Sequence, residues 1–381
     1  MLRSKRLCEI QSLFLINPVL AILGPRQCGK TTLAKAYCEA FSELPLHYFD
    51  LENPLDLRRL EQPMTQLSEL TGLIVIDEIQ RRPELFPILR VLVDQNRPRK
   101  FLILGSASRL LIQQSSETLA GRISYMELTP FVFEEVQELK NLWLRGGFPK
   151  SYLLMDDDMS LRWRLDYIRT FLEQDIPNLG IKIPPAELAR FWLMLTHVHG
   201  NIFNASELGR SLGLTHTTIK RYLDILTGTF MIRTLTPWFE NLSKRQVKSP
   251  KIYFRDSGIF HAQLQISKHN QLITHPKLGA SWEGFALESI IQHHRAAPQE
   301  VFFWGTQSGA ELDLLIIKNG QRLGFEFKYQ DAPGITKSMH IALADLNLDH
   351  LTVIHPATGT YQLAEKISSN GLIDYLKPCG A

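Results

Sequence analysis

The residue types best suited to chemistry begin in an early glycine-rich stretch, GPRQCGKT. The pattern G-x-x-x-x-G-K-[ST] is typical of a phosphate-binding loop, because its glycines let backbone N–H groups face phosphate oxygens and the helix that follows adds partial positive charge. We expect the Lys30 ammonium to pair with the β- and γ-phosphates and the Thr31 hydroxyl to bind Mg²⁺. The expected nucleotide contacts are Gly24, Pro25, Arg26, Gln27, Cys28, Gly29, Lys30, Thr31 and Thr32.

Two carboxylates with matching chemistry follow 47 residues beyond Lys30, at the end of the apolar run LIVIDE. Carboxylates are costly to bury at the end of a strand, so their presence there indicates a function. Asp77 is expected to hold the Mg²⁺ shell and Glu78 to polarise the attacking water as general base. The alternative, a strand–helix turn without a ligand, leaves both carboxylates unexplained. ATP and Mg²⁺ are therefore the expected cofactors, and ATP hydrolysis is the expected reaction.

Three more residues near these motifs have two interpretations each. Ser106 ends the apolar run FLILG, where its hydroxyl is suited either to sensing the γ-phosphate or to capping the next helix. Arg122, in LAGR, is either an arginine finger or phosphate sensor, or a solvated surface side chain. Cys28 stands at a variable loop position and is expected to be inert, unless its thiol makes the site sensitive to oxidation.

A second set of acidic residues lies near the C-terminus. ELDLLI places Asp313 on one strand, and LGFEFKY places Glu326 and Lys328 on one face of the next. This is the arrangement of the PD-(D/E)xK nuclease fold, in which two carboxylates hold Mg²⁺ near the scissile phosphate and the lysine stabilises developing charge or positions the water. On the preceding helical stretch, Glu283 is favoured over Glu288 as a further metal ligand. A strand face with alternating charges is the alternative, since Leu312 stands where the motif's proline would be.

The middle of the chain carries a basic helix-turn-helix pattern, NASELGRSLGLTHTTIKRYLDIL. Asn204 with Glu207 is suited to cap the first helix, Gly213 to make the turn and Thr215 to cap the second. The second helix would then have one apolar face, formed by Leu214, Ile219, Tyr222, Leu223 and Leu226. The side chains left exposed, where a recognition helix carries its groove-facing residues, are His216, Thr217, Lys220 and Arg221.

The charge around this pattern favours a nucleic-acid partner. From Asn204 to Arg255 there are nine Lys/Arg against three Asp/Glu, and four of those cations lie in KRQVKSPK, Lys244–Lys251. Such a cluster beside a helix-turn-helix suits contact with a phosphate backbone. A packing module and a solvated charged face are the alternatives.

The elements that must position these residues form an α/β protein. PVLAILG, LIVIDE and KFLILGS indicate buried strands, and the helical patterns between them favour a parallel sheet covered on both faces. After GGFPK the pattern is helical to about residue 199, and beyond Ser249 strands return in KIYF, EVFFW, ELDLLII and LGFEFKY. We expect three parts: a nucleotide-binding domain at residues 1–150, a helical and helix-turn-helix region at 151–245, and a nuclease-like domain at 246–381.

Composition limits the remaining options. A chain of 381 residues with 44% apolar types can bury a sizeable core, and a formal net charge of +3 gives no global signal for nucleic acid or disorder. Four cysteines without CxxC spacing fit a reducing compartment and give no zinc signature. There is no run of about 18 apolar residues, so we expect no membrane span and a cytoplasmic protein.

Several segments together resemble the prokaryotic AAA-type ATPases that carry a C-terminal domain of unknown function. They are GPRQCGKTTLAK, LIVIDEIQRRPELFPILRVLVD, LILGSAS, LAGRISYMELTPF, RGGFPKSYL, ELGRSLGLTHTTIKRYLDIL, NLSKRQVKSPKIYFRDSGI and LGFEFK, which cover about residues 19–330. The resemblance implies an AAA-like P-loop core of the ASCE class, a winged helix and a C-terminal domain similar to restriction endonucleases. Many AAA-like enzymes complete their sites with an arginine from a neighbouring subunit, so a homo-oligomer is compatible with it.

These observations lead to an Mg²⁺-dependent ATPase coupled to a DNA-binding, nuclease-like module. A nucleotide-switched DNA- or protein-binding regulator, whose nuclease-like scaffold is inactive, is the alternative. A regulatory ATPase that docks another protein through the basic segment is a third, and its binding would lack a steep salt dependence.

Overall fold

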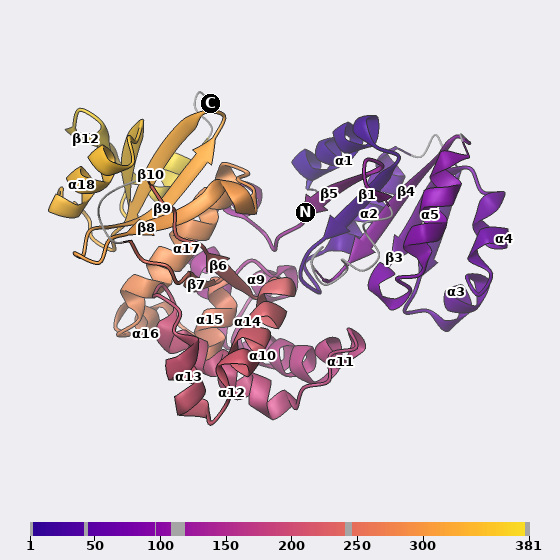
Figure 1. Ribbon diagram of the computed structural model, residues 1–381, viewed down its shortest axis with the longest axis horizontal. Coiled ribbons are helices and arrows are strands. Elements are labelled where there is room, and N and C mark those ends of the chain that lie inside the picture. Colours follow the sequence, from indigo (N-terminus) through magenta and orange to yellow (C-terminus); the bar gives the residue numbers. More distant parts are fainter. Residues whose placement is uncertain (1–2, 42–44, 96, 108–118, 241–245, 378–381) are drawn as a thin grey trace. The chain divides into compact units, whose positions relative to one another are not determined.

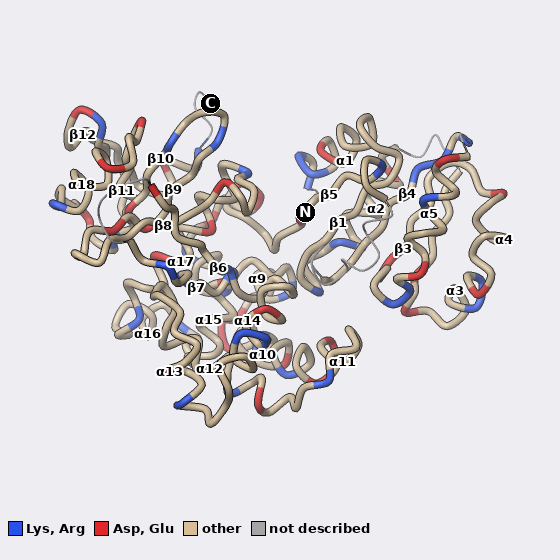
Figure 2. Tube along the Cα trace, viewed as in Figure 1, with Lys and Arg blue, Asp and Glu red and all other residues tan. Residues whose placement is uncertain are grey.

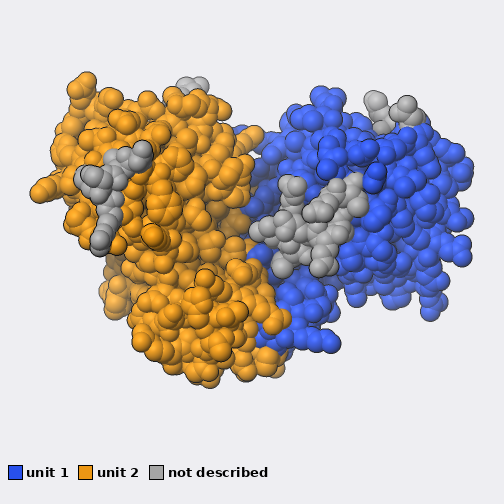
Figure 3. All heavy atoms as spheres, in the orientation of Figure 1, with its two compact units in different colours: residues 1–130, 171–183, 228–231 blue, residues 131–170, 184–227, 232–381 orange. Residues whose placement is uncertain are grey.

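The computed structural model describes residues 3–41, 45–95, 97–107, 119–240 and 246–377. The chain divides into two compact units (Figure 3), of which the first comprises residues 1–130, 171–183 and 228–231 and the second residues 131–170, 184–227 and 232–381. The three-part division expected at residues 150 and 245 stays a prediction. The compact units are drawn differently, because two short segments from the middle of the chain return to the first unit.

The first unit is built on a five-stranded parallel sheet with the strand order β2-β3-β4-β1-β5 (Figure 1). Its strands are β1 (Val19–Leu23), β2 (Leu46–Asp50), β3 (Gly72–Asp77), β4 (Arg99–Gly105) and β5 (Ile123–Glu127). All five residues of β1 and all six of β3 are buried, as the unbroken apolar runs predicted for strands covered on both faces. The expected parallel α/β sheet is thus confirmed.

Helices cover each face of this sheet and supply two separate apolar cores. The helices are α1 (Ser4–Ile16), α2 (Lys30–Ala40), α3 (Pro54–Arg59), α4 (Pro63–Ser68), the 3₁₀ turn η1 (Ile79–Arg81), α5 (Leu85–Asp94), the π-helix η3 (Phe171–Asp175) and α11 (Ile176–Asn178). On one face, Leu20 and Val75 pack with side chains of α1 and α2. On the other, Ala21 and Ile74 pack with side chains of α5, and Phe230 from the last segment of the unit joins this core.

The second unit begins with a helical layer. Its helices are α7 (Phe133–Val136), α8 (Leu139–Arg145), α9 (Pro149–Leu153), α10 (Asp157–Thr170), α12 (Pro185–Val198), α13 (Ala205–Leu212), α14 (His216–Gly228, whose last residue belongs to the first unit), α15 (Ser257–Gln263), α16 (His269–Ile273), α17 (Leu278–His293), the 3₁₀ turn η4 (Pro298–Glu300), α18 (Lys337–Asp345) and α19 (Leu372–Leu376). The helical pattern expected up to residue 199 is confirmed by α9, α10 and α12.

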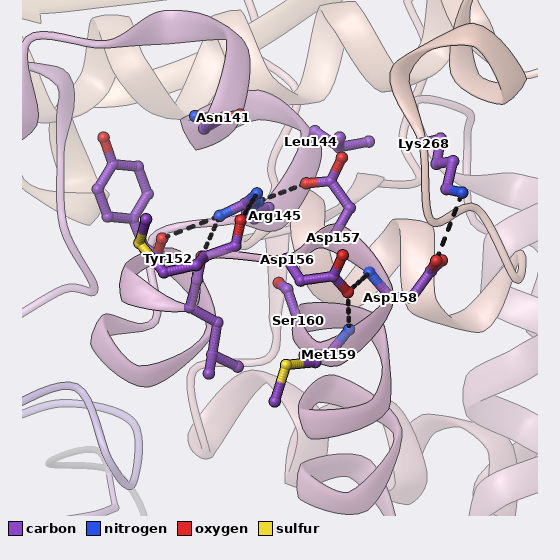
Figure 4. A network of polar contacts seen from close by, with 12 residues as sticks. Asn141, Leu144, Arg145, Tyr152, Asp156, Asp157, Asp158, Met159, Ser160 and Lys268 are labelled. Carbon is purple, nitrogen blue, oxygen red and sulfur yellow. Dashed lines mark hydrogen bonds and ion pairs between the residues drawn. The ribbon is translucent and has the colours of Figure 1, made fainter.

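A buried arginine ties the first helices of this layer together (Figure 4). The Arg145 guanidinium pairs with Asp157 at 2.6 Å and donates to the backbone carbonyls that close α9, among them that of Leu154. Directly after it, Gly146 has a φ of 74°, and a Cβ added there would lie 2.1 Å from the Asp256 Oδ1. The same Asp256 accepts a hydrogen bond from the Gly147 N–H at 2.8 Å. The RGGF and RDSG segments therefore form one tightly packed joint.

The second unit also holds a six-stranded mixed sheet with the order β12-β13-β11-β10-β9-β8 and a separate antiparallel pair, β6 with β7. The strands are β6 (Ile232–Leu235), β7 (Lys251–Phe254), β8 (Val301–Gly305), β9 (Glu311–Lys318), β10 (Gln321–Phe327), β11 (His350–His355), β12 (Thr360–Ala364) and β13 (Ile367–Gly371). The four strands expected beyond Ser249 are confirmed as β7, β8, β9 and β10. One face of the large sheet packs on α17 and the other on α18.

Candidate functional sites

The phosphate-binding loop connects β1 to α2 through a tight backbone turn. A Cβ added to Gly24 would lie 2.1 Å from the Leu128 carbonyl oxygen, and Gly29 caps α2 with a φ of 100°, a conformation that side chains disfavour. The Lys30 ammonium lies inside the turn and donates to the carbonyls of Gly24 and Pro25, each at 2.9 Å. The loop thus curls around the Lys30 ammonium.

The carboxylate that ends β3 lies directly beside this loop. The Thr31 hydroxyl donates to the Asp77 Oδ2 at 2.7 Å, and the Tyr48 hydroxyl donates to the same oxygen at 2.7 Å. Asp77 is only 4% exposed. Burial, followed by the nearby Asp77, raises the pKa of Tyr48 well above its ordinary range, so Tyr48 stays a hydrogen-bond donor. Sequence reasoning missed Tyr48, although its register opposite Val75 puts it on the same face as Asp77.

Glu78 is held in place by two polar side chains. Its backbone is left-handed, with a φ of 57°, and its Oε2 accepts hydrogen bonds from the Ser106 hydroxyl at 3.2 Å and from the Gln80 amide. Gln80 also donates to the Ser106 oxygen at 2.9 Å. Burial raises the pKa of Glu78, and the Lys30 charge opposes that rise. Ser106 therefore lies beside Glu78, and its role as a sensor of the γ-phosphate stays a prediction, while Gln80 is a neighbouring residue that sequence reasoning missed.

Two further loop residues, Arg26 and Cys28, differ in their surroundings. Arg26 pairs with Glu52 at 2.6 Å and with Asp175 of the π-helix η3, and these three line a narrow pocket with Glu78 and other residues. Cys28 is fully buried, and its thiol donates to the Leu128 carbonyl at 3.3 Å. Burial raises the pKa of this thiol, which removes the reactive thiolate and fits the expectation of an inert cysteine.

Arg122 does not lie with the loop. It precedes β5, whose first residue Ile123 pairs with Val19 at the start of β1, whereas the loop follows the other end of β1. Its guanidinium binds both carboxylate oxygens of Asp94, at 2.7 and 3.1 Å. A role for Arg122 as phosphate sensor within its own chain therefore needs correction, because parallel strands separate it from the loop by their full length. A role as finger toward a neighbouring subunit stays a prediction.

The expected acidic residues of the second unit gather beside β7. Asp313 on β9 and Glu326 on β10 are each 4% exposed. The two strands are antiparallel, and Asp313 and Glu326 are the residues next to the paired Leu314 and Phe325. The Asp313 Oδ2 accepts from the Phe327 N–H at 3.1 Å, and the Lys328 ammonium lies 2.9 Å from the Glu326 Oε2. The structure thus brings Asp313, Glu326 and Lys328 together.

Of the two candidate acids on α17, only Glu283 belongs to this group. The Tyr253 hydroxyl donates to Glu283 at 2.7 Å. Burial, and then the Asp313 charge, raise the pKa of Glu283, and the Lys251 charge opposes that rise. Glu288 instead binds the Arg233 guanidinium through both oxygens, one at 2.9 Å. Among the described residues no three His, Cys, Asp or Glu side chains converge as a ready-made metal site. Glu283 already accepts a hydrogen bond from Tyr253. That Glu283, Asp313 and Glu326 bind one metal ion together therefore stays a prediction.

The helix-turn-helix residues adopt the expected local structure. The Asn204 side chain accepts from the Glu207 N–H at 3.2 Å, Gly213 ends α13 with a φ of 70°, and Thr215 accepts from the Thr218 N–H at 3.1 Å. On α14, the side chains that face the core include Ile219, Tyr222, Leu223 and Leu226. Those exposed are His216, Thr217, Lys220 and Arg221.

The basic run after this pattern is only partly exposed. Lys244 and Arg245 lie outside the described residues, and Lys248 is exposed. Lys251 is 4% exposed on β7, with its ammonium turned toward Asp313. Its expected contact with a nucleic-acid backbone is therefore wrong, because a buried ammonium that is already paired with carboxylates cannot reach one.

Figure 2 shows acidic and basic residues interspersed along both units. No described helix has the length and apolar character to cross a bilayer.

Comparison with known families agrees with the loop and the sheet. Residues 16–137 match an AAA domain, residues 136–270 a domain of unknown function (DUF8612) and residues 278–372 another domain of unknown function (DUF4143). The phosphate loop, the parallel sheet and the AAA match define a P-loop, ATPase-like protein. Two uncharacterized proteins, from Mycobacterium tuberculosis and Mycobacterium bovis, are each 46% identical to it over 370 residues, which cover 94% of this chain and 83% of theirs. The chain belongs to their family, AAA-domain proteins with a C-terminal domain of unknown function.

The chain is also similar, at lower identity, to an archaeal protein and to solved structures. An uncharacterized protein of Methanocaldococcus jannaschii is 21% identical over 387 residues, covering 91% of this chain and 83% of its own. Among solved structures, a Walker-type ATPase of Pyrococcus abyssi is 14% identical with a TM-score of 0.49, covering 69% of this chain and 95% of that one. The Holliday junction branch migration motor RuvB of Thermotoga maritima is 17% identical with a TM-score of 0.31, covering 61% of this chain and 88% of that one.

Proposed function

We propose that the first unit binds ATP with Mg²⁺ and hydrolyses the nucleotide. The observation that carries this proposal is the 2.7 Å hydrogen bond from the Thr31 hydroxyl to Asp77, which joins the first turn of α2 to the end of β3 beside Lys30. A hydroxyl and a carboxylate are the oxygen ligands that Mg²⁺ prefers. Their separation suits one ion bound between them, and the curled loop fits a phosphate.

Each side chain has a distinct task in this proposal. Lys30 exchanges its two carbonyl partners for phosphate oxygens and neutralises their charge. Thr31 and Asp77 hold the Mg²⁺, which supplies charge stabilisation when bound. Glu78 accepts a proton from the attacking water, and burial supports this role because it raises the pKa of the carboxylate toward that of an effective base. Gln80 and Ser106 fix the direction of the Glu78 carboxylate.

Steady-state ATPase assays test the proposal. Lys30→Ala is expected to weaken nucleotide binding and lower turnover by about 100-fold or more, since removal of one charge-stabilising donor costs that much in comparable sites. Glu78→Gln should keep nucleotide affinity but lose turnover, because only the proton acceptor is removed. Glu39→Gln, an exposed carboxylate on α2, is the matched control. Turnover by Glu78→Gln equal to that of the control would refute the role of Glu78.

We also propose that α14 binds DNA. The exposed face with Lys220 and Arg221, set on a helix whose other face is buried, supports this function. Lys220→Ala and Arg221→Ala are each expected to weaken binding equally for all sequences and to reduce the slope of log K against log salt by about 1. Lys268→Ala serves as a control cation on the same unit. A salt-independent interaction would favour a protein partner.

We further propose that Asp313, Glu326 and Lys328 carry metal-dependent phosphodiester cleavage, under the control of nucleotide state in the first unit. The proximity of these side chains, two of them buried, supports it. Plasmid and single-stranded DNA are incubated with Mg²⁺ or Mn²⁺, with ATP, with ADP and without nucleotide. Cleavage should disappear in Asp313→Ala and Glu326→Ala. Cleavage that survives both substitutions, or no cleavage with either metal, would mean that the nuclease-like scaffold is inactive. Equal cleavage rates with ATP, with ADP and without nucleotide would contradict control by the nucleotide state.

A further inference from the structure

A buried lysine from outside the predicted motif enters the acidic group of the second unit. Lys251, on β7, has its ammonium 3.6 Å from the Asp313 Oδ1 and 3.4 Å from the Glu311 Oε1, and 5.5 Å from the centre of the Phe303 ring. It is 4% exposed. Burial of an ammonium costs several kcal/mol unless carboxylates compensate it, so these contacts are what keep Lys251 inside.

The strand that carries Lys251 contributes a second side chain to the same group. Tyr253 lies two residues further along β7, which places it on the same face as Lys251, and its hydroxyl donates to the Glu283 Oε1 at 2.7 Å. β7 thus holds one cation against Asp313 and one neutral donor against Glu283. Two of the three candidate metal-binding carboxylates therefore already have partners from this strand.

The third carboxylate is differently placed. Glu326 is 4% exposed, and its Oε2 is paired with Lys328, but its Oε1 is buried without a hydrogen-bond partner among the described residues. A buried carboxylate oxygen without a partner costs free energy, and such an atom in a polar group indicates a ligand that satisfies it. For the ionised carboxylate this ligand must be a cation or a donor, because an ionised carboxylate oxygen accepts only.

Charge supports a cation. Around this point four carboxylates, Glu283, Glu311, Asp313 and Glu326, face two ammonium groups, those of Lys251 and Lys328. When all four carboxylates are ionised, two negative charges remain, which one divalent cation would neutralise. An ion bound to Glu326 Oε1 and Asp313 would have only oxygen ligands, the preference of Mg²⁺ and Mn²⁺.

We propose that Lys251 is a resident cation of this site, and that the site therefore binds one divalent cation, at Glu326 and Asp313, instead of two. The proposal rests on the metal binding proposed for the second unit. Lys251 is a positioning residue here: it neutralises the Asp313 and Glu311 side of the group, where a second ion would otherwise bind.

The test counts ions without measuring cleavage. The nucleotide-free full-length chain carrying Thr31→Ala, which removes a metal ligand proposed for the first unit, is titrated with Mn²⁺, and free ion is followed by electron paramagnetic resonance. We expect one bound Mn²⁺ per chain. Lys251→Met should bind two, Lys251→Arg one and Glu326→Gln none. Lys248→Met, an exposed lysine three residues earlier, should still bind one.

The outcomes separate the two proposals. Two ions in the chain with Lys251 intact would overturn the resident-cation role and leave the proposed metal binding standing. No ion in that chain would overturn the metal binding itself. One ion in Lys251→Met, with unchanged circular dichroism, would also overturn the role of Lys251. Should Lys251→Met fail to fold, the counts for the intact chain and for Lys251→Arg still decide.

Discussion

Gln80 shows how a residue that was not predicted for the site can control the proposed general base. Its amide contacts both the Glu78 carboxylate and the Ser106 hydroxyl, so it fixes where that carboxylate points. We expect Gln80→Ala to lower the kcat for ATP hydrolysis about fivefold with an unchanged KM, since one lost hydrogen bond is worth about 1 kcal/mol. Gln62→Ala, an exposed glutamine, is the control. A change confined to KM would mean that Gln80 contacts the nucleotide instead.

The acidic group of the second unit predicts an unusual dependence of stability on pH. Burial, and then the Asp313 charge, raise the pKa of Glu326 to about 8, from an ordinary value of 4.5. The folded state therefore holds this proton where the unfolded state has lost it, so the stabilisation is complete below about pH 4.5 and is lost as pH rises toward 8. In urea titrations with EDTA, the free energy of unfolding should fall across this range, and Glu326→Gln should flatten the decline. A steeper decline in the variant would contradict this assignment.

At this scale the sequence predicted the residues that belong to continuous motifs and missed those supplied by neighbours. Lys30 and Thr31 lie in one continuous motif, GPRQCGKT, and Asp77 and Glu78 lie in a second, LIVIDE. Tyr48 and Lys251 reach their sites only through strand pairing and packing, which no local spacing records. Lys251 did leave a signal, a lone cation in the buried strand KIYF. A lysine at a buried strand position requires an acidic partner, so Lys251 in KIYF indicates that carboxylates lie close to it.

At the scale of elements, the joint between RGGF and RDSG should tolerate little change. Ala at Gly146 combines a left-handed backbone with a Cβ that would overlap Asp256, so Gly146→Ala is expected to destabilise the protein by about 3 kcal/mol. Gly309 has a φ of 92° but open space around it. Gly309→Ala should therefore cost only about 1 kcal/mol, from backbone strain alone. Equal losses for both variants in urea unfolding would show that the Asp256 contact is unimportant.

Element type was largely predictable, and element pairing was not. Apolar runs predicted β1, β3 and β4, and helical spacing predicted the buried face of α14, because burial follows periodicity directly. The sequence carries no comparable local signal for β4 lying between β1 and β3, or for β7 pairing with β6 while its side chains enter another sheet's acidic group. Those arrangements depend on contacts between residues far apart in the chain.

At the scale of the whole molecule, the chain passes between its two compact units five times. Segments 171–183 and 228–231 belong to the first unit although they follow residue 130 by many positions. They supply Asp175, which pairs with Arg26 of the loop, and Phe230, which is buried in the core behind the sheet. The boundary predicted at residue 150 could not anticipate this, since composition changes where the chain first leaves a unit and not where it returns.

A fragment of residues 1–150 should therefore be incomplete. It retains the phosphate loop but lacks both returning segments, so part of the apolar core is exposed and Arg26 loses a partner. We expect it to melt about 2–4 °C or more below a fragment of residues 1–231, since a loss of about 1 kcal/mol shifts Tm by that much in a domain of this size. Equal melting temperatures would show that the returning segments do not stabilise the first unit.

The return of residue 230 to the first core also sets an order of events during synthesis. Ribosomes add about 5–20 residues per second, so roughly 100 residues between the first and last parts of this unit take about 5–20 s to make. During that time the nascent sheet carries its phosphate loop without a closed core. The unit with the phosphate-binding loop is complete only after α14 has been synthesised, so a chain that stops early lacks part of this core and is accessible to proteases and chaperones.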